Sequence, residues 1–462
     1  MKHYWLVTLI AIALVALAAC APAPTPAPTA APPTSAPAPA TSAPQATTAS
    51  AQPTPLAGAG SSTTASAQPT SGAAGTVKLT NGKVVLGVIT DESGPYAELA
   101  GKNSVAAVQM AVDDFKAKYG DNALGGPISV IDADHQNKPD LAASKAQEFY
   151  DRDGADIILD VPTSSAALAI AKVAADKKKL YINITGATTD LTGASCNKYT
   201  FHYAYDTYML AAGTGATVTK DIGKKWYIVY PNYAFGQDMD KSFTAAIQAN
   251  GGTVIASDPS PWPNDTGDFS SLLLKAPTLK PDILGSMNAG TDLVNLVKQY
   301  NEFKLKDQGI KLAIGLLFDT DIRALGPDAF AGVIYTTPWL WTMDDQARAF
   351  ADRFQKRTGS RPTFAHAGNY SAAMQYLEAI RRAGTDDADA VVKQLEGYKF
   401  SDFFIRNGYI RPEDHWVMHD ALLAQVKPKS QVTEDWDYSK ILSTLPAAVV
   451  SRPLSETGCK MK

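Results

Sequence analysis

The sequence predicts an α/β protein made of two doubly wound parallel-sheet lobes. Short continuous apolar runs alternate with helical apolar spacing from about residue 84, and this rhythm restarts after a stretch around 202–208. Strands that are apolar throughout, set between amphipathic helices, are typical of parallel sheets covered on both faces. Roughly 385 residues follow the N-terminal region, which is too many for a single core of usual size. We therefore expect two α/β lobes.

The first series of elements begins at 84–89, an apolar strand that ends in a Ser-Gly-Pro loop. In the helix that follows, Val105, Val108, Val112 and Phe115 fall on one face. The same alternation predicts further strands at 128–131, 156–159 and 180–184, with helices at about 140–151 and up to about 176.

The second series predicts strands at 227–230, 253–256 and 282–285, with helices at about 236–250 and 291–303. From about residue 345 the pattern is helical, followed by a short β segment at 416–426 and an irregular tail to 462. Helices after the second series suggest that the chain returns to the first lobe. We assign 78–206 plus 342–425 to lobe 1, and 207–341 plus 426–462 to lobe 2 and the C-terminal tail.

Residues 1–20 have the form of a lipoprotein signal peptide. A short polar start is followed by an apolar run over 5–18, which ends at Leu17-Ala18-Ala19-Cys20. About 14 apolar residues are too few to span a bilayer. In an ordinary cleaved signal Cys20 would be incidental. Because the small residues precede the cysteine where the run ends, we expect lipidation of Cys20, an extracytoplasmic location and attachment to the bacterial membrane through the lipid only.

Residues 21–77 read as a disordered tether rich in Pro, Ala, Thr and Ser. Between 21 and 70 there is no charged or aromatic residue, and the segment holds 12 of the 29 prolines. Such a composition offers no apolar surface to offset the entropy of ordering. At roughly 3.1 Å per residue in polyproline II, it would reach about 150 Å at most. We expect a spacer between membrane and domain.

Charge and cysteine usage narrow the class of protein further. The formal charge is −4, with no basic patch that would predict nucleic-acid binding, and no later stretch reaches 18 continuous apolar residues. Of three cysteines, Cys196 and Cys459 remain after Cys20. In an oxidising compartment two such cysteines more often pair than stay free. We expect a disulfide that holds the C-terminal tail to lobe 1.

No motif predicts an enzyme, a metal or a cofactor. The sequence contains no G-x-S-x-G elbow, H-E-x-x-H, Walker loop or C-x-x-C. The stretch 132–135, Asp-Ala-Asp-His, resembles a metal motif, but alternating ligands at a strand end would point to opposite faces. We interpret it as a polar exit from the strand.

Small polar residues follow two neighbouring strands at the edge where open parallel sheets bind ligands. Ser164 and Ser165 open a helix, where hydroxyls and free backbone N–H groups suit a carboxylate, although they also suit plain N-capping. Gly186 and Thr188 repeat this design after the next strand. Loops of the same kind also carry Tyr96, Tyr233, Phe235 and Asn288, and the expected crossing between lobes carries Trp339 and Trp341. Together they predict a cleft between two sheets.

Along this cleft the chain resembles ABC-transporter solute-binding proteins of the branched-chain amino-acid (leucine/isoleucine/valine-binding) type, which have the type I periplasmic binding fold. The resemblance covers about 82–459 and rests on the order and spacing of six short motifs. They are Ile-Thr-Asp-Glu-Ser-Gly-Pro-Tyr at 89–96, Thr-Ser-Ser at 163–165, Ile-Thr-Gly-Ala-Thr at 184–188, Tyr-Ala-Phe-Gly at 233–236, Asp-Phe-Ser-Ser-Leu at 268–272 and Asn-Ala-Gly at 288–290.

The resemblance implies two lobes joined by three crossovers, with the ligand closed between them. It places the ligand carboxylate on Ser165 and Thr188, with the Gly186 backbone beside it and Ser164 as the alternative to Ser165. Phe235 stands where the family often has a tyrosine. Asp319 lies near the position of the acid that pairs with the ammonium of an amino acid; an aromatic carboxylate would not need that acid.

These observations predict a non-enzymatic, monomeric binder that delivers a small carboxylate to the transmembrane subunits of an ABC permease. A branched-chain or related amino acid is the first expectation, and a benzoate-like or cinnamate-like acid is the alternative. A ligand sensor of the same fold is a second class, which a lipid anchor makes less favoured. An exported hydrolase is a third class, but it would need a nucleophile and base that we do not find.

Overall fold

The computed structural model describes residues 77–461. The predicted signal peptide, lipidated Cys20 and nearly all of the predicted tether lie outside the described residues. Within 77–461, no helix is both long enough and apolar enough to cross a bilayer.

The first lobe is built on a five-stranded parallel sheet in the order β2-β1-β3-β4-β5. Its strands are β1 (Val84–Thr90), β2 (Ile128–Asp134), β3 (Ile157–Asp160), β4 (Leu180–Asn183) and β5 (Thr200–His202). Its helices are α1 (Gly101–Tyr119), α2 (Pro139–Glu148), which continues as a π-turn over Phe149–Asp153, α3 (Ser164–Lys177), and the later α11 (Asp345–Thr358), α12 (Phe364–Ala383) and α13 (Ala388–Leu395).

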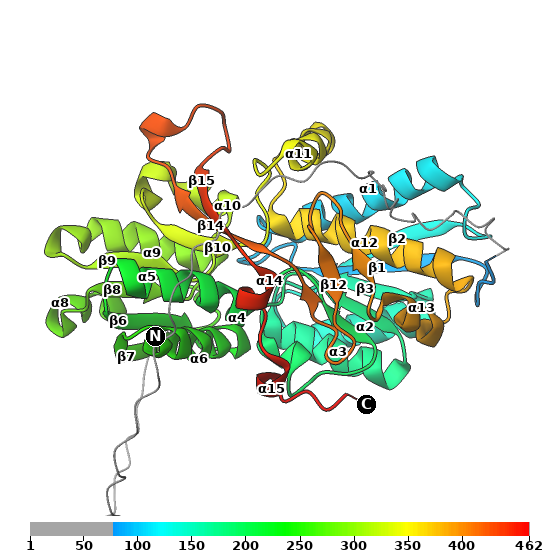
Figure 1. Ribbon diagram of the computed structural model, residues 1–462, viewed down its shortest axis with the longest axis horizontal. Coiled ribbons are helices and arrows are strands. Elements are labelled where there is room, and N and C mark those ends of the chain that lie inside the picture. The colour runs from blue at the N-terminus through cyan, green and yellow to red at the C-terminus, as the bar shows by residue number, and fades with distance from the viewer. Residues whose placement is uncertain (1–76, 462) are drawn as a thin grey trace, which may run out of the picture. The chain divides into compact units, whose positions relative to one another are not determined.

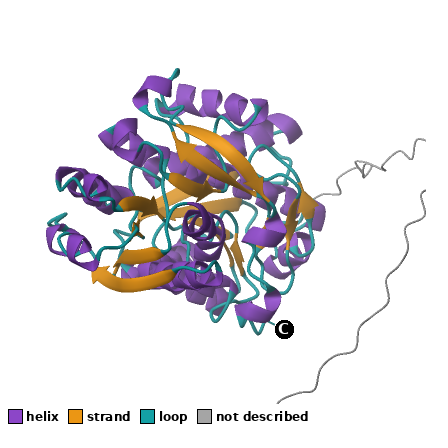
Figure 2. Ribbon diagram, turned by 60° about the vertical axis from the view of Figure 1, so that its left-hand side comes forward, coloured by secondary structure: helices purple, strands orange, loops and turns teal. Residues whose placement is uncertain are grey.

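The inner strands β1, β3 and β4 are buried on both faces, which explains their apolar runs, whereas the edge strand β2 is partly exposed and carries polar residues. Val84, Leu86 and Val88 pack into the core that contains α1 and α12, whereas Val85 and Ile89 pack against α2 and α3. Helices therefore lie on both sides of the strands (Figure 2). As predicted, α12 returns to this lobe, where it packs along α1 and against β3.

The second lobe is built on a four-stranded parallel sheet in the order β7-β6-β8-β9. Its strands are β6 (Lys225–Pro231), β7 (Thr253–Ser260), β8 (Ile283–Ser286) and β9 (Lys311–Ile314). Its helices are α4 (Thr207–Leu210), α5 (Ala216–Asp221), α6 (Ala234–Ala249), α7 (Ser270–Leu273), α8 (Ala276–Leu279), α9 (Gly290–Glu302) and α10 (Asp319–Leu325), with a π-turn over Ala211–Gly215. Figure 1 shows the two sheets in separate lobes.

The C-terminal part of the chain runs between the lobes. An antiparallel sheet joins β10 (Ile334–Thr337), β14 (Ala421–Val426) and β15 (Ser439–Leu445), and a small one joins β11 (Lys399–Phe400), β12 (Gly408–Ile410) and β13 (Val417–Met418). The prediction of an irregular tail was wrong, because β15 and the short helices α14 (Ala447–Val450) and α15 (Leu454–Thr457) lie within it. The residue at which each lobe begins and ends stays a prediction.

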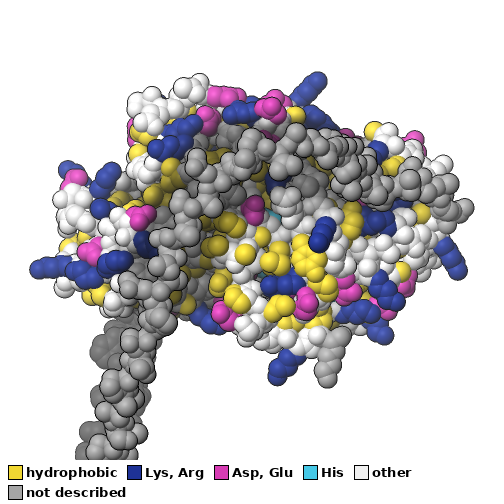
Figure 3. Space-filling view, in the orientation of Figure 1, with side chains coloured by type: hydrophobic (Ala, Val, Ile, Leu, Met, Phe, Trp, Pro, Cys, Tyr) yellow, Lys and Arg dark blue, Asp and Glu magenta, His cyan; other side chains and the backbone are white. Residues whose placement is uncertain are grey.

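The tail ends at the first lobe. A disulfide joins Cys459 to Cys196, which precedes β5, with an S–S distance of 2.02 Å. The Arg452 guanidinium also donates to the Thr189 carbonyl at 2.9 Å. On the face seen in Figure 3, Lys and Arg side chains are interspersed with Asp and Glu, in keeping with the small net charge.

Candidate ligand-binding site

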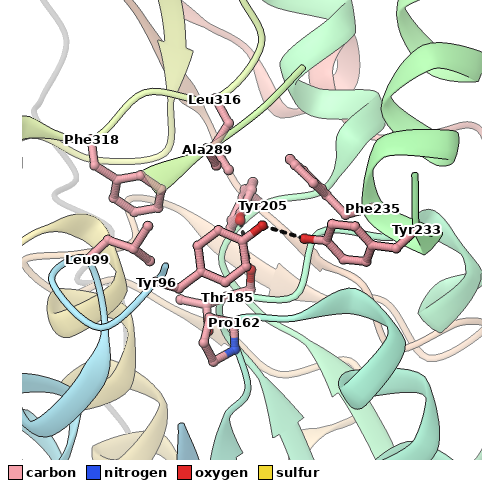
Figure 4. A pocket seen from close by; sticks show the side chains of 10 residues that line it. All are labelled: Tyr96, Leu99, Pro162, Thr185, Tyr205, Tyr233, Phe235, Ala289, Leu316 and Phe318. Atoms are coloured by element: carbon pink, nitrogen blue, oxygen red, sulfur yellow. Dashed lines mark hydrogen bonds between the residues drawn. The ribbon is translucent and has the colours of Figure 1, made fainter. Parts of the chain in front are cut away.

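A small cavity lies where the two parallel sheets turn their carboxyl edges toward each other. Its volume is about 10 Å³, which corresponds to about one water molecule. The first lobe and the crossover after β5 contribute Tyr96, Leu99, Pro162, Thr185 and Tyr205, and the second lobe contributes Tyr233, Phe235, Ala289, Leu316 and Phe318 (Figure 4). These residues lie in or next to loops that follow strands, the edge at which open α/β sheets bind ligands.

An aromatic contact joins the lobes at this cavity. The hydroxyl oxygens of Tyr96 and Tyr233 are 2.6 Å apart, so one donates to the other (Figure 4). Burial raises the pKa of both side chains, so both stay neutral at physiological pH. Trp262 stacks on the two rings, with centroid distances of 5.4 Å to Tyr96 and 4.4 Å to Tyr233. The closed cleft is thus covered by three aromatic rings from both lobes.

The loop that carries Tyr96 is held by a carboxylate at the end of β1. Asp91 accepts from the backbone N–H groups of Gly94 at 2.7 Å and Tyr96 at 2.8 Å, and from the Asn137 amide at 2.7 Å. The same loop meets the second lobe, because the Thr291 N–H donates to the Pro95 carbonyl at 3.2 Å.

That contact requires a glycine at the start of α9. Gly290 has a φ of 58°, and a Cβ there would lie 2.3 Å from the Pro95 oxygen. A side chain at this position would therefore push the two lobes apart.

A second carboxylate lies beneath the floor of the cavity. Thr185 donates its hydroxyl to Asp160 at 2.5 Å and accepts at its carbonyl from the Tyr205 hydroxyl at 2.7 Å. Asp160 is fully buried, and burial raises the pKa of its carboxyl group. Asp160 and the next residue, Val161, have φ values of 79° and 71°, a conformation that is rare for a β-branched residue. Strain of this kind often clusters at ligand sites.

Of the predicted site residues, the structure brings Tyr96, Tyr233 and Phe235 together in the cavity wall. Ser164 and Thr188 are buried just behind it. The Ser164 hydroxyl accepts from the Ala187 N–H at 3.2 Å, and the Thr188 hydroxyl accepts from the Asp190 N–H at 3.3 Å. Both hydroxyls therefore shape loops next to the cavity and do not line it.

Ser165 and Gly186 also lie beside the wall. Ser165 is half-buried in the first turn of α3, three residues after the cavity residue Pro162. Gly186 is enclosed, since a Cβ there would lie 2.7 Å from the Asn183 side-chain oxygen and 2.8 Å from the Ala167 methyl. Its N–H donates to that same Asn183 oxygen at 3.1 Å.

Asn288 and Asp319 are neighbours in sequence of the cavity residues Ala289 and Phe318. Asn288 is buried and accepts from the Ser260 hydroxyl at 3.2 Å. Asp319 lines a separate cavity of about 10 Å³, whose wall includes Phe318 and Trp339. Burial, and then repulsion from Asp321 and Asp437, raises the pKa of Asp319 to about 7.

Trp339 and Trp341 pack inside the protein and do not line the main cavity. The Trp339 ring N–H donates to the Phe403 carbonyl at 3.0 Å, and that of Trp341 donates to the Trp436 carbonyl at 3.1 Å. Sequence reasoning missed the wall residues Leu99, Pro162, Thr185, Tyr205, Ala289, Leu316 and Phe318. All of these except Tyr205 lie within three residues of a predicted position. Tyr205 carries no sequence signal that separates it from core residues.

Residues 132–135 have structural partners. Asp134 accepts from the Ser93 hydroxyl at 2.6 Å, and the Asp132 carboxylate pairs with Lys102 at 2.6 Å. Burial lowers the pKa of His135 to about 4. Among the described residues, no group of three or more His, Cys, Asp or Glu side chains is placed to hold a metal ion.

Two α/β lobes that close over a cavity at their facing strand ends define a bilobal ligand-binding protein. The chain belongs to the periplasmic binding protein family, whose model matches residues 83–431.

Known proteins support this assignment over most of the chain. A periplasmic binding protein from Burkholderia mallei is 41% identical, with a TM-score of 0.78, over 82% of this chain and 99% of its own. A branched chain amino acid ABC transporter periplasmic ligand-binding protein from Burkholderia xenovorans LB400 is 37% identical, with a TM-score of 0.73 and the same coverage. The Leu/Ile/Val-binding protein BraC3 of Rhizobium johnstonii is 26% identical over 323 residues, 70% of this chain and 85% of its own.

A more distant structure shares the fold alone. It is a solute binding protein of an ABC transporter from Rhodopseudomonas palustris BisB5 in complex with 3,4-dihydroxy benzoic acid, 23% identical with a TM-score of 0.70, over 79% of this chain and 98% of its own.

The family model and the two Burkholderia structures confirm the predicted fold and family: the chain is an extracytoplasmic solute-binding protein of the ABC-transporter type.

Proposed function

We propose that the protein binds a small aromatic carboxylate between its lobes and hands it to an ABC permease. The observation that carries this proposal is the character of the cavity wall. Five of its ten residues are aromatic, namely Tyr96, Tyr205, Tyr233, Phe235 and Phe318, and none is charged. A flat ring is the ligand shape that such a wall accepts with least loss of contact.

The absence of charge in this wall also argues against an ammonium group on the ligand. Burying an unpaired charge in a closed cleft costs several kcal/mol. An amino acid would meet this cost if its ammonium group found no anion in the cleft. The buried carboxylates next to the cavity have other neighbours: Asp160 holds Thr185 and Asp91 holds the Tyr96 loop. A carboxylate without an ammonium leaves only the anion to be paired, and N–H donors at the start of a helix suit an anion.

For the ligand carboxylate we propose the beginning of α3 and the loop after β4. The N-terminus of α3 directs free N–H groups and a positive dipole end toward this edge of the sheet, and Pro162 at its start already lines the cavity. The predicted residues Ser164 and Ser165 belong to the first of these segments, and Gly186 and Thr188 belong to the second. Because the cavity holds only about one water molecule when closed, a ligand enters by separating the Tyr96 and Tyr233 rings, whose hydroxyls can then donate to it.

A branched-chain amino acid is the second candidate, and one observation favours it. Phe318 forms part of both the main cavity and the smaller cavity that contains Asp319. If Phe318 turned aside, the Asp319 carboxylate would face the ligand and could pair with an ammonium. The Burkholderia xenovorans relative, which is described as a branched chain amino acid ABC transporter protein, is consistent with this alternative.

Isothermal titration calorimetry with benzoate, 4-hydroxybenzoate, L-leucine and L-isoleucine tests the proposal. We expect at least one of the aromatic acids to bind and the amino acids to bind at least tenfold more weakly. Ser165→Ala and Thr188→Ala should each weaken binding by about tenfold, since a hydrogen bond to a charged group contributes about 1.5–3 kcal/mol. Binding of leucine that is lost in Asp319→Asn would instead establish the second candidate.

The attachment of the protein to the membrane is a separate proposal, based on the sequence before the described residues. We propose that Cys20 carries a lipid, that residues 21–77 act as a spacer, and that the folded part works as a monomer beside a permease. Cys20→Ser should release the protein from the membrane fraction and abolish palmitate labelling. Retention and labelling of the Ser variant would refute the anchor and leave the ligand site unaffected.

A further inference from the structure

A buried carboxylate of the second lobe reaches into the first lobe beside the ligand cavity. Asp238 lies on α6, one turn after the cavity residue Phe235, and is 9% exposed. Its carboxylate accepts from the Thr189 N–H at 2.6 Å, from the Thr189 hydroxyl at 3.0 Å and from the Thr207 hydroxyl at 2.7 Å. All of these donors are neutral groups from outside α6.

The donors belong to the parts of the chain that must move when the lobes separate. Thr189 begins the short 3-10 helix Thr189–Thr192 of the first lobe, four residues after Thr185 in the cavity floor. Thr207 begins α4, directly after the crossover that carries Tyr205. The Thr207 N–H in turn donates to the Ala187 carbonyl at 2.9 Å. The loop after β4 is thus tied to α6 both directly and through the crossover.

We propose that Asp238 is a positioning residue for the ligand site, which holds α6 and the loop 185–189 at the separation of the closed cleft. Phe235 on one side of the cavity and Thr185 on the other are then fixed relative to each other by one carboxylate. This inference rests on the proposal that the ligand binds between the lobes. Asp238 would then influence the affinity for the ligand without contacting the ligand.

The physical basis is that the two hydrogen bonds from Thr189 join Asp238 to the first lobe, whereas the bond from Thr207, at the start of α4, lies within the second lobe. Charge-assisted bonds to a buried carboxylate are short and stronger than neutral ones. A contact that is present in one conformation and replaced by water in the other shifts the population toward the first. The Thr189 N–H also belongs to the loop for which a ligand carboxylate is expected, so the protein fills one donor of that loop with its own anion.

Asp240 offers a matched control on the same helix. Its carboxylate accepts from the Ser257 hydroxyl at 2.6 Å, a contact within the second lobe. Asp238→Ala and Asp240→Ala remove the same group from positions two residues apart, but only the first crosses between the lobes. Asp238→Asn keeps one side-chain oxygen as an acceptor for the Thr189 N–H and should behave as a partial rescue.

The test combines hydrogen exchange of the full chain, without ligand, with calorimetry using 3-phenylpropanoate and L-leucine as probes. In Asp238→Ala we expect faster exchange both in the peptide around 187–192 and in the peptides around 94–97 and 290–293, where the Pro95–Thr291 contact joins the lobes. Affinity for the probe that binds should fall about tenfold in Asp238→Ala, less in Asp238→Asn and not in Asp240→Ala.

Two results would overturn the inference. One is faster exchange confined to 187–192 with unchanged affinity, because Asp238 would then only cap a local turn. The other is equal loss of affinity in Asp240→Ala. If neither probe binds the wild-type protein, exchange at 94–97 and 290–293 alone decides the role of Asp238.

Discussion

The two lobes contribute different chemistry to the cavity they share. In the first lobe two wall residues are held by buried carboxylates: Asp91 holds the backbone of Tyr96, and Asp160 holds Thr185. In the second lobe the wall is Phe235, Ala289, Leu316 and Phe318 beside a single tyrosine, with Trp262 stacked outside. The first lobe therefore presents fixed hydroxyls and loops, and the second presents apolar surface.

This difference suggests that the two lobes recognise different parts of the ligand. Polar groups that are already buried and ordered lose little conformational freedom on binding, so the first lobe is suited to orient a carboxylate. Apolar surface gains from the removal of water whatever its orientation, so the second lobe is suited to close over the ring. The predictions below test first the contact between the lobes and then the contribution of each.

Gly290→Ala should have the largest effect, because it places a Cβ against the Pro95 carbonyl of the opposite lobe. We expect ligand affinity to fall by about 100-fold or more, which corresponds to roughly 3 kcal/mol. Gly309→Ala is the control: its φ is 81°, but a Cβ there has no atom within 4 Å. Both variants should lose about 1–2 kcal/mol of folding stability from the left-handed backbone. Equal affinities of the two variants, measured by calorimetry, would contradict closure through this contact.

Tyr96→Phe should weaken ligand binding by about fivefold to tenfold, since it removes a hydroxyl that joins the lobes and leaves the Tyr233 hydroxyl unpaired. Tyr150→Phe is a suitable control, because the Tyr150 hydroxyl is also buried but donates to the Leu180 carbonyl within the first lobe. Calorimetry should find its affinity unchanged and only its stability reduced. A similar loss of affinity in both variants would mean that the Tyr96 hydroxyl acts through general stability.

Trp262→Ala should weaken binding by about threefold to tenfold, mainly by faster dissociation. The indole stacks outside Tyr96 and Tyr233, and such aromatic pairs contribute about 0.5–1.5 kcal/mol beyond their area. Stopped-flow release of the ligand measures the effect. An unchanged dissociation rate would show that the second lobe does not cover the site through this residue.

The smallest expected effect concerns the pH dependence of stability at Asp292, in the first turn of α9. Burial, and then repulsion from Asp265, raises its pKa from 3.8 to about 7. Because the folded-state pKa is raised, the contribution of Asp292 to the free energy of unfolding is fully present below the unfolded pKa. This contribution is lost as the pH rises through about 7. The stability of the wild type should therefore fall between about pH 4 and 7 relative to Asp292→Asn, by about 1–2 kcal/mol. Exposed Asp307→Asn serves as the control in thermal unfolding, and parallel curves for all three proteins would refute the assignment.

The sequence allowed the parallel sheets to be predicted because inner strands such as β1, β3 and β8 are buried on both faces and leave continuous apolar runs, although the edge strands β2 and β7 are partly exposed. It did not reveal β15, since most of Ser439–Leu445 is exposed and the strand has no apolar alternation. The same contrast holds in the site. Tyr96, Tyr233 and Phe235 could be predicted because they follow predicted strands. Tyr205 and Trp262 also follow strands, but β5 was not predicted and the predicted strand 253–256 stops four residues before β7 ends at Ser260.

The central claim is that the cavity accepts a carboxylate with an apolar body and rejects the ammonium group of an amino acid. Its most direct test compares ligands that differ only in that group: 3-phenylpropanoate with L-phenylalanine, and 4-methylpentanoate with L-leucine, by calorimetry on the wild-type protein. We expect the acid without the ammonium to bind at least tenfold more tightly in whichever pair binds. Tighter binding of the amino acid in either pair would contradict the claim.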